Sequence, residues 1–320
     1  MDGGEVTETG PLQRTSKICF AILAHTNRPC LDDQVRNLRT FAPTADVVLF
    51  NGGRDPNLAD GLDIDVCPYS QPLRYERVAR FHGEIMRWLH ETGREFDFLV
   101  TIDSDVLLIK PGFEAFLDRA MADSAYMGVL FRRVEKDTEW ITGRRFHYVW
   151  RRAWQPIFEV EHPYGCFCPG QVFRGEYVER LLRFPRLDEL FERIERSRLR
   201  DLEELIWATL AVTLECNPRR YPDAVSASVR YRKRHAPGEI RAYLDDPDVF
   251  LLHPVPMSLD APERRLIRLL REGAPVDFDA LQEAFEQEIV PVPNHLRIRG
   301  SLFSPLLSKA YDAYLRVAPE

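Results

Sequence analysis

The stretch FDFLVTIDSDVLLIKPG, residues 96–112, runs from apolar residues into two aspartates, Asp103 and Asp105, with Ser104 between them. A continuous apolar run of this length is typical of a strand buried on both faces of a parallel sheet. Carboxylates directly after such a strand indicate that the strand presents them to a ligand. The alternative is that they start a turn, because aspartate is common where strands end.

The segments around this strand repeat a strand–helix order. KICFAILAH (17–25) and ADVVLFNGG (45–53) are apolar strand candidates, and 31–41 between them has helical spacing, which together predict a βαβ unit. A helix is expected over 76–93 and a further strand over 124–134. We therefore predict an α/β fold, a Rossmann-type mixed sheet flanked by helices. Ligands of open α/β sheets bind at the carboxyl ends of the strands, where the two aspartates fall.

The rest of the chain sets the predicted domains. Residues 1–15 are expected to be a disordered leader, 16–258 the main domain and 259–320 a helical C-terminal extension. The aromatic, Gly- and Pro-containing middle, 135–175, lacks a clear period and predicts a functional loop. Within it, 162–171 could frame a substrate. Three tryptophans there offer faces for sugar stacking, with core packing as the alternative: Trp140, Trp150 and Trp154.

Composition excludes several classes of protein. The 320 residues carry a net charge of −7, which argues against a dedicated nucleic-acid binder. No apolar run is long enough for a transmembrane helix, and the N-terminus lacks the apolar part of a signal peptide. A cytoplasmic protein is expected; the amphipathic tail 301–317 could touch a membrane surface, but its few basic residues favour packing on the domain. Six cysteines without CxxC pairs argue against structural zinc.

The aspartate pair has a defined chemistry. Two carboxylates one residue apart on a turn can hold a hard divalent cation such as Mn²⁺ or Mg²⁺. Such a cation bridges the phosphates of a nucleotide and neutralises a diphosphate leaving group. The chain has no GxGxxG or Walker-type phosphate loop, which disfavours dinucleotide and P-loop enzymes.

The order βαβ, helix, apolar strand and Asp-Ser-Asp resembles the nucleotide-sugar glycosyltransferases of the GT-A fold. The resemblance implies a divalent metal held by Asp103 and Asp105, with Asp105 the direct ligand and Asp103 nearer the ribose or sugar. The small Ser104 would pass close to the ligand. His253, at the end of a late strand, matches the place of a further metal ligand, and an ordinary strand-end histidine is the alternative.

A second stretch, DLEELIWATL (201–210), resembles a segment of the core-2 β-1,6-N-acetylglucosaminyltransferase and peptide O-xylosyltransferase family. That resemblance implies that Glu204 is the catalytic base, with Glu203 as the fallback. The alternative is a capping box, since Asp201 and Glu204 have its spacing. Core-2 enzymes use basic residues in place of the Asp-Ser-Asp motif, so the metal requirement stays open. This chain also has a basic run over 229–235.

The remaining candidates concern the donor nucleotide. Arg232 and Lys233 of the basic run could contact a diphosphate, or the run could be a solvated loop. Strand ends and the helix after them contribute further candidates: His25, Thr26, Asn51 and Arg80.

Together these features predict a hexosyl- or N-acetylhexosaminyltransferase. It would use a nucleotide-diphosphate sugar, with UDP-sugar as the expected donor, and an inverting mechanism with a glutamate base. The acceptor hydroxyl would belong to a glycan, a lipid-linked glycan or a small molecule. The alternatives are a catalytically inactive sugar-binding or scaffold protein and, ranked below it, a nucleotidyltransferase.

Overall fold

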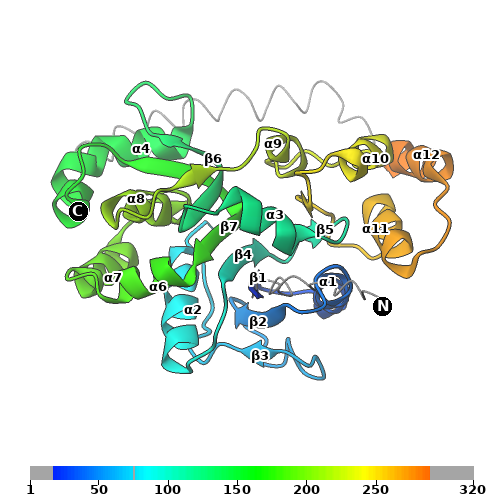
Figure 1. Ribbon diagram of the computed structural model, residues 1–320, viewed down its shortest axis with the longest axis horizontal. Coiled ribbons are helices and arrows are strands. Elements are labelled where there is room, and N and C mark those ends of the chain that lie inside the picture. The colour runs from blue at the N-terminus through cyan, green and yellow to red at the C-terminus, as the bar shows by residue number, and fades with distance from the viewer. Residues whose placement is uncertain (1–16, 75, 289–320) are drawn as a thin grey trace, which may run out of the picture.

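The computed structural model describes residues 17–74 and 76–288, so the predicted leader 1–15 and the tail helix 301–317 lie outside the described residues. Its centre is a seven-stranded sheet in the order β3-β2-β1-β4-β7-β6-β8 (Figure 1). The strands are β1 (Ile18–Ala24), β2 (Asp46–Asn51), β3 (Asp65–Val66), β4 (Phe98–Asp103), β6 (Tyr126–Arg133), β7 (Tyr164–Arg174) and β8 (Arg219–Arg220).

The sheet is mixed. β1 pairs in parallel with both β2 and β4, while β7 runs antiparallel between β4 and β6. A small second sheet joins β5 (Leu107–Leu108) to β9 (Leu251–Leu252). Since β4 lies between β1 and β7, the Asp-Ser-Asp motif follows a central strand, as predicted.

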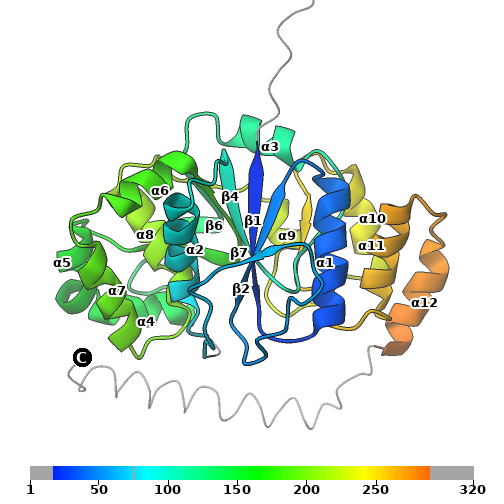
Figure 2. The same ribbon diagram turned by 90° about the horizontal axis from the view of Figure 1, so that it is seen from below.

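Helices cover both faces of the sheet (Figure 2). One side carries α1 (Arg28–Phe41), α10 (Pro237–Asp245), α11 (Pro262–Glu272) and α12 (Phe278–Glu288). The other carries α2 (Ala79–Glu91), α4 (Ile141–Val149), α5 (Gln155–Phe158), α6 (Gly175–Leu182), α7 (Leu187–Arg196) and α8 (Ile206–Thr213). The helices α3 (Phe113–Ala120) and α9 (Val225–Ser228) complete the α-helices of the described chain. The predicted α/β fold with a helix-flanked mixed sheet is confirmed.

Alternating side chains of each strand explain the continuous apolar runs. In β1, Phe20 and Ile22 enter the core beneath α1, whereas Cys19 and Ala21 enter the core beneath α2, and all four are fully buried. A strand with apolar layers on both faces needs apolar residues at every position.

The prediction for the middle of the chain was wrong. Residues 162–171, expected to be a loop, lie mostly in β7, and the segment before it forms α4, a π-helical turn η1 (Trp150–Trp154) and α5. The glycines and proline of β7 hid its strand pattern, and the neighbouring strands β4 and β6 supply its hydrogen-bond partners. Trp150 and Trp154 are buried in the core and present no face for a sugar.

The C-terminal extension contains helices within its described part, α11 and α12. The guanidinium of Arg264 on α11 is almost fully buried, and its Nη1 donates to Asp33 Oδ2 of α1 at 2.9 Å. Arg271 donates to the same carboxylate at 2.9 Å. Helix α11 is therefore part of the packing that supports the sheet. None of the helices in the described part of the chain is long and apolar enough to cross a membrane.

Candidate functional site

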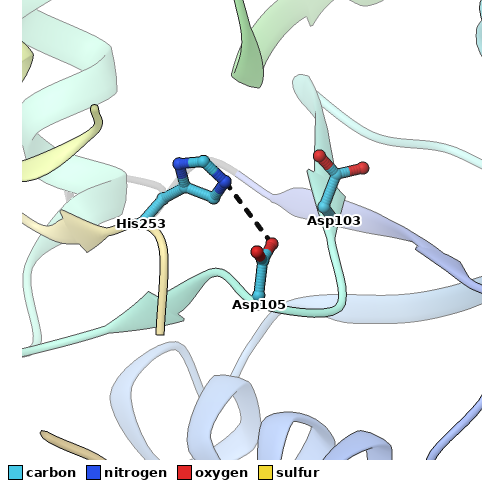
Figure 3. Close-up of side chains that lie close together, drawn as sticks. All are labelled: Asp103, Asp105 and His253. Atoms are coloured by element: carbon cyan, nitrogen blue, oxygen red, sulfur yellow. Dashed lines mark ion pairs between the residues drawn. The ribbon is translucent and has the colours of Figure 1, made fainter. Parts of the chain in front are cut away.

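Three potential metal ligands meet at the carboxyl edge of the sheet (Figure 3). Asp103 ends β4, Asp105 follows in the turn, and His253 comes directly after β9. One ligand atom from each of the three lies within 4.8 Å of the others. His253 Nε2 is 3.5 Å from Asp105 Oδ1. The structure thus brings together the three predicted metal ligands from positions 150 residues apart in the chain.

Buried polar side chains hold the backbone of the turn that carries the two aspartates. Gln34 of α1 donates through Nε2 to the carbonyls of Asp103 and Val106, each at 2.8 Å. Asn37, one turn later, exchanges two hydrogen bonds of 2.8 Å with the backbone of Leu108. These amides pair backbone groups of the turn and of the residues after it, and so hold the backbone from which the two carboxylates project.

Residues near the C-terminal end brace the same turn. The N–H of Val255 donates to the Asp105 carbonyl at 2.8 Å, and Arg264 Nη2 donates to the Ser104 carbonyl at 3.4 Å. The backbone of Ser104, which the sequence singled out only for its small size, is thereby held by α11.

The hydrogen bond of the other ring nitrogen orients the His253 imidazole. Its Nδ1 lies 3.0 Å from the Arg230 carbonyl, which can only accept, so Nδ1 carries the proton. Burial lowers the pKa of His253, although the Asp105 carboxylate opposes this effect. A neutral ring with a proton on Nδ1 turns the Nε2 lone pair towards a carboxylate oxygen. Two acceptors that face one another in this way are suited to share a cation.

Charge repulsion between Asp103 and Asp105 also favours a bound cation. Burial, and then the negative charge of Asp105, raise the pKa of Asp103 to about 7. A cation between the two carboxylates would remove this repulsion. Two carboxylates and one imidazole are a fitting ligand set for Mn²⁺ or Mg²⁺, so the residues present fit the predicted metal.

A cavity of about 600 Å³ lies beside the cluster. Phe167, Val229 and Arg230 belong to its wall, and all three also adjoin His253: Phe167 by an edge-on ring contact, Val229 by a β-bridge and Arg230 by its carbonyl. Glu204 and Trp140 line the same cavity. The volume suits a small ligand.

Glu204 and Glu203 lie in different surroundings. Glu204, at the end of the 3₁₀ turn η2 (Leu202–Glu204), lines the cavity. Burial, followed by the negative charge of Glu203, raises the pKa of Glu204 well above its usual range. The Trp140 side chain and the Cys168 backbone act in the opposite direction, because they favour the ionised form of its carboxyl and so lower its pKa.

Glu203 is buried and is not among the residues that line the cavity. Oε2 of its carboxyl group has no hydrogen-bond partner among the described residues. Burial and the charge of Asp201 raise the pKa of Glu203 to about 8.

The predicted donor-site residues of β1 and β2 lie at the same sheet edge. His25 Nδ1 is 2.8 Å from the Gly52 carbonyl, and Thr26 is exposed. A Cβ on Gly53 would come within 1.9 Å of the His25 carbonyl oxygen, so only glycine lets the two strand ends approach. Both ends of the Asn51 side chain hydrogen-bond the loop that follows β2.

Two of the three basic residues predicted for the donor site, Arg80 and Lys233, lie beside carboxylates. Arg80 lies where α2 meets α7, with bonds of 3.0 Å to Glu84 and 2.8 Å to Glu195. Lys233 is exposed and 3.8 Å from Glu239, and the Arg232 guanidinium stacks over the Tyr231 ring.

Two further arginines of the basic run are tied up in bidentate pairs. Arg230 binds Glu239 at 2.8–2.9 Å, and Arg234 binds Glu263 at 2.7 Å. Arg232 and Lys233 lie in the exposed part of the run.

Sequence reasoning missed the supports of the site. Gln34 and Asn37 stand at buried positions of the apolar face of the helix predicted over 31–41, a signal that could have been found. Arg264 gave no such signal, because only the tertiary structure brings it to the turn. Trp140, one of the three tryptophans singled out for sugar stacking, does line the cavity.

No protein-family model and no curated protein matches the chain. Among solved structures, the chain is similar to the galactosyltransferase LgtC in complex with donor and acceptor sugar analogues, at 11% identity and a TM-score of 0.42, over 82% of this chain and 97% of that chain. It is also similar to the glycosyltransferase GlyE of Streptococcus pneumoniae TIGR4, at 11% identity and a TM-score of 0.44, over 86% of this chain and 64% of that chain.

Proposed function

We propose that the protein is a glycosyltransferase that moves a sugar from a nucleotide-diphosphate donor, a UDP-sugar in the first instance, to an acceptor hydroxyl. The observation that carries this proposal is the Asp103–Asp105–His253 cluster at the sheet edge, next to a cavity that Glu204 lines. A cluster that suits a cation and an adjacent cavity with a carboxylate together supply the two halves of a transfer site: one for the diphosphate and one for the acceptor.

Each half has residues with a stated task. Asp103, Asp105 and His253 would hold Mn²⁺ or Mg²⁺, which when bound stabilises the negative charge of the departing diphosphate. His253 keeps Nε2 free for that purpose by donating its Nδ1 proton to the Arg230 carbonyl. Hydrogen bonds from Gln34 to the Asp103 carbonyl and from Arg264 to the Ser104 carbonyl hold the backbone of the turn that carries the aspartates.

Glu204 would accept the proton of the acceptor hydroxyl as that oxygen attacks the anomeric carbon, with inversion of configuration. The similarity of DLEELIWATL to the core-2 family supports this assignment, and membership of that family is part of the proposal. Burial raises the pKa of Glu204, while the Trp140 side chain and the Cys168 backbone lower it because they favour the ionised form of this carboxyl, and the ionised form is the one that can accept a proton. The raised pKa makes the ionised Glu204 a stronger proton acceptor than an ordinary carboxylate.

The test separates Glu204 from its neighbour. Release of nucleoside diphosphate from UDP-, GDP- and TDP-sugars is measured with Mn²⁺ for the wild type, Glu204→Gln and Glu203→Gln. Loss of a general base should cost Glu204→Gln roughly 10²- to 10⁴-fold in kcat. Glu203→Gln keeps the cavity unchanged and should retain activity within about tenfold.

A second measurement tests the donor half. Nucleotide binding is followed by calorimetry with and without Mn²⁺, on the wild type and on Asp105→Ala. Metal-dependent binding of one nucleotide that is lost in Asp105→Ala supports the proposal. Binding of no nucleotide or nucleotide sugar under any metal condition would refute it and leave an inactive binding or scaffold protein.

A further inference from the structure

A second cleft, of about 290 Å³, lies between the segment that leads into α2 and the end of α7. We call it the arginine cleft, because Arg74, Arg77 and Arg80 line it. Glu195 is the one carboxylate in its lining, so its charged lining carries a net positive charge in a protein whose net charge is −7.

Two of the three arginines are available to a ligand. Arg74 is exposed and has no carboxylate partner among the described residues, and neither has Arg77, whose Nη2 donates only to the Arg198 carbonyl at 3.3 Å. Arg80 is different, because Glu84 and Glu195 hold its guanidinium. Guanidinium groups without a carboxylate partner bind phosphate oxygens through paired, charge-assisted hydrogen bonds.

The cleft is separate from the candidate cation cluster. Its lining contains none of Asp103, Asp105 and His253. Leu202 of η2 lines the cleft, while Glu204, two residues later, lines the cavity, so η2 lies between the two spaces. The rest of the lining is mixed, with the apolar Leu73, Ile194 and Leu199 beside the polar Gln71 and Ser197. The arginines of this lining fit a phosphoryl group.

We propose that the arginine cleft binds the phosphoryl group of a ligand other than the sugar-nucleotide donor. Phosphate binding itself is independent of the proposed function, whereas the exclusion of the donor rests on the assignment of the donor diphosphate to the cation cluster. The phosphoryl group has two sources, a phosphorylated acceptor or free inorganic phosphate.

The experiment is calorimetric titration of inorganic phosphate and of a sugar phosphate monoester into the full chain in EDTA, without nucleotide. Arg74→Ala and Arg77→Ala should each weaken binding about tenfold. Glu195→Gln should strengthen it, because it removes the one carboxylate of the lining. Arg183→Ala is the matched control, an arginine whose side chain is 81% exposed and lies outside the cleft lining.

The outcomes separate the sources and the proposals. Tighter binding of the sugar phosphate than of inorganic phosphate indicates a phosphorylated acceptor; equal binding indicates free phosphate; both support the cleft. The proposal is overturned if the wild type binds neither probe, if the two arginine variants and Glu195→Gln bind like the wild type, or if binding needs Mn²⁺ and Asp105. Failure of sugar transfer would leave these titrations unchanged, because they contain neither cation nor donor.

Discussion

Replacing Arg264 with methionine tests whether the C-terminal helix α11 braces the metal-binding turn. The substitution keeps an unbranched side chain but removes the hydrogen bonds of the guanidinium. These go to Asp33 Oδ2 at 2.9 Å, to the Pro256 carbonyl at 2.6 Å and to the Ser104 carbonyl at 3.4 Å. The Arg264 side chain is only 1% exposed, so water cannot replace the lost partners.

The expected cost can be worked out from these contacts. Breaking a buried ion pair on one side costs about 3–5 kcal/mol. Arg271 still neutralises Asp33 at 2.9 Å, which keeps the carboxylate paired. We therefore expect the lower end of the range, about 3 kcal/mol of unfolding free energy. The affinity for Mn²⁺ should also fall, because the Ser104 carbonyl loses its anchor.

The assay is urea unfolding followed by tryptophan fluorescence, with calorimetric Mn²⁺ titration on the folded variant. The control is Arg265→Met, since Arg265 is the exposed neighbour on the same helix. A loss for Arg264→Met within about 0.5 kcal/mol of the loss for Arg265→Met, the range typical of surface substitutions, would refute the bracing role.

Three further predictions concern the turn and the carboxylates. Asn37→Leu should lower the free energy of unfolding in urea by about 1–3 kcal/mol, because the buried N–H and carbonyl of Leu108 lose their hydrogen-bond partner. A variant as stable as the wild type would contradict the role of Asn37 in holding this backbone. Burial raises the pKa of Glu203 to about 8, above its value of 4.5 in the unfolded chain, so the folded state retains a proton that the unfolded state releases. The free energy of unfolding of the wild type should therefore decline as pH rises from about 4.5 to 8, and Glu203→Gln should flatten that decline. If wild type and variant lose stability equally over this pH range, the raised pKa of Glu203 is refuted. Because the base acts when ionised, kcat should rise with pH through a pKa well above 4.5, and a profile already flat at pH 5 would exclude Glu204 as that base.

Much of the fold could be read from local pattern. The apolar runs over 17–25, 45–53 and 96–103 each became a strand, because a strand covered on both faces must be apolar at every position. The strand β7 could not be read in this way. Its glycines and proline weaken the local signal, and it is stabilised by pairing with β4 and β6, which the chain supplies from 98–103 and 126–133.

The sequence by itself determined the Asp-Ser-Asp motif at the end of a central strand, since one apolar run followed by two charges contains that information locally. It also pointed to His253 and Glu204, through resemblance. Only the tertiary structure decided that His253 meets Asp105, that Glu204 and not Glu203 lines the cavity, and that Arg264 reaches Ser104 across 160 residues. The physical reason is that these contacts join elements distant in sequence, and the orientation of each side chain depends on hydrogen-bond partners that no local pattern specifies.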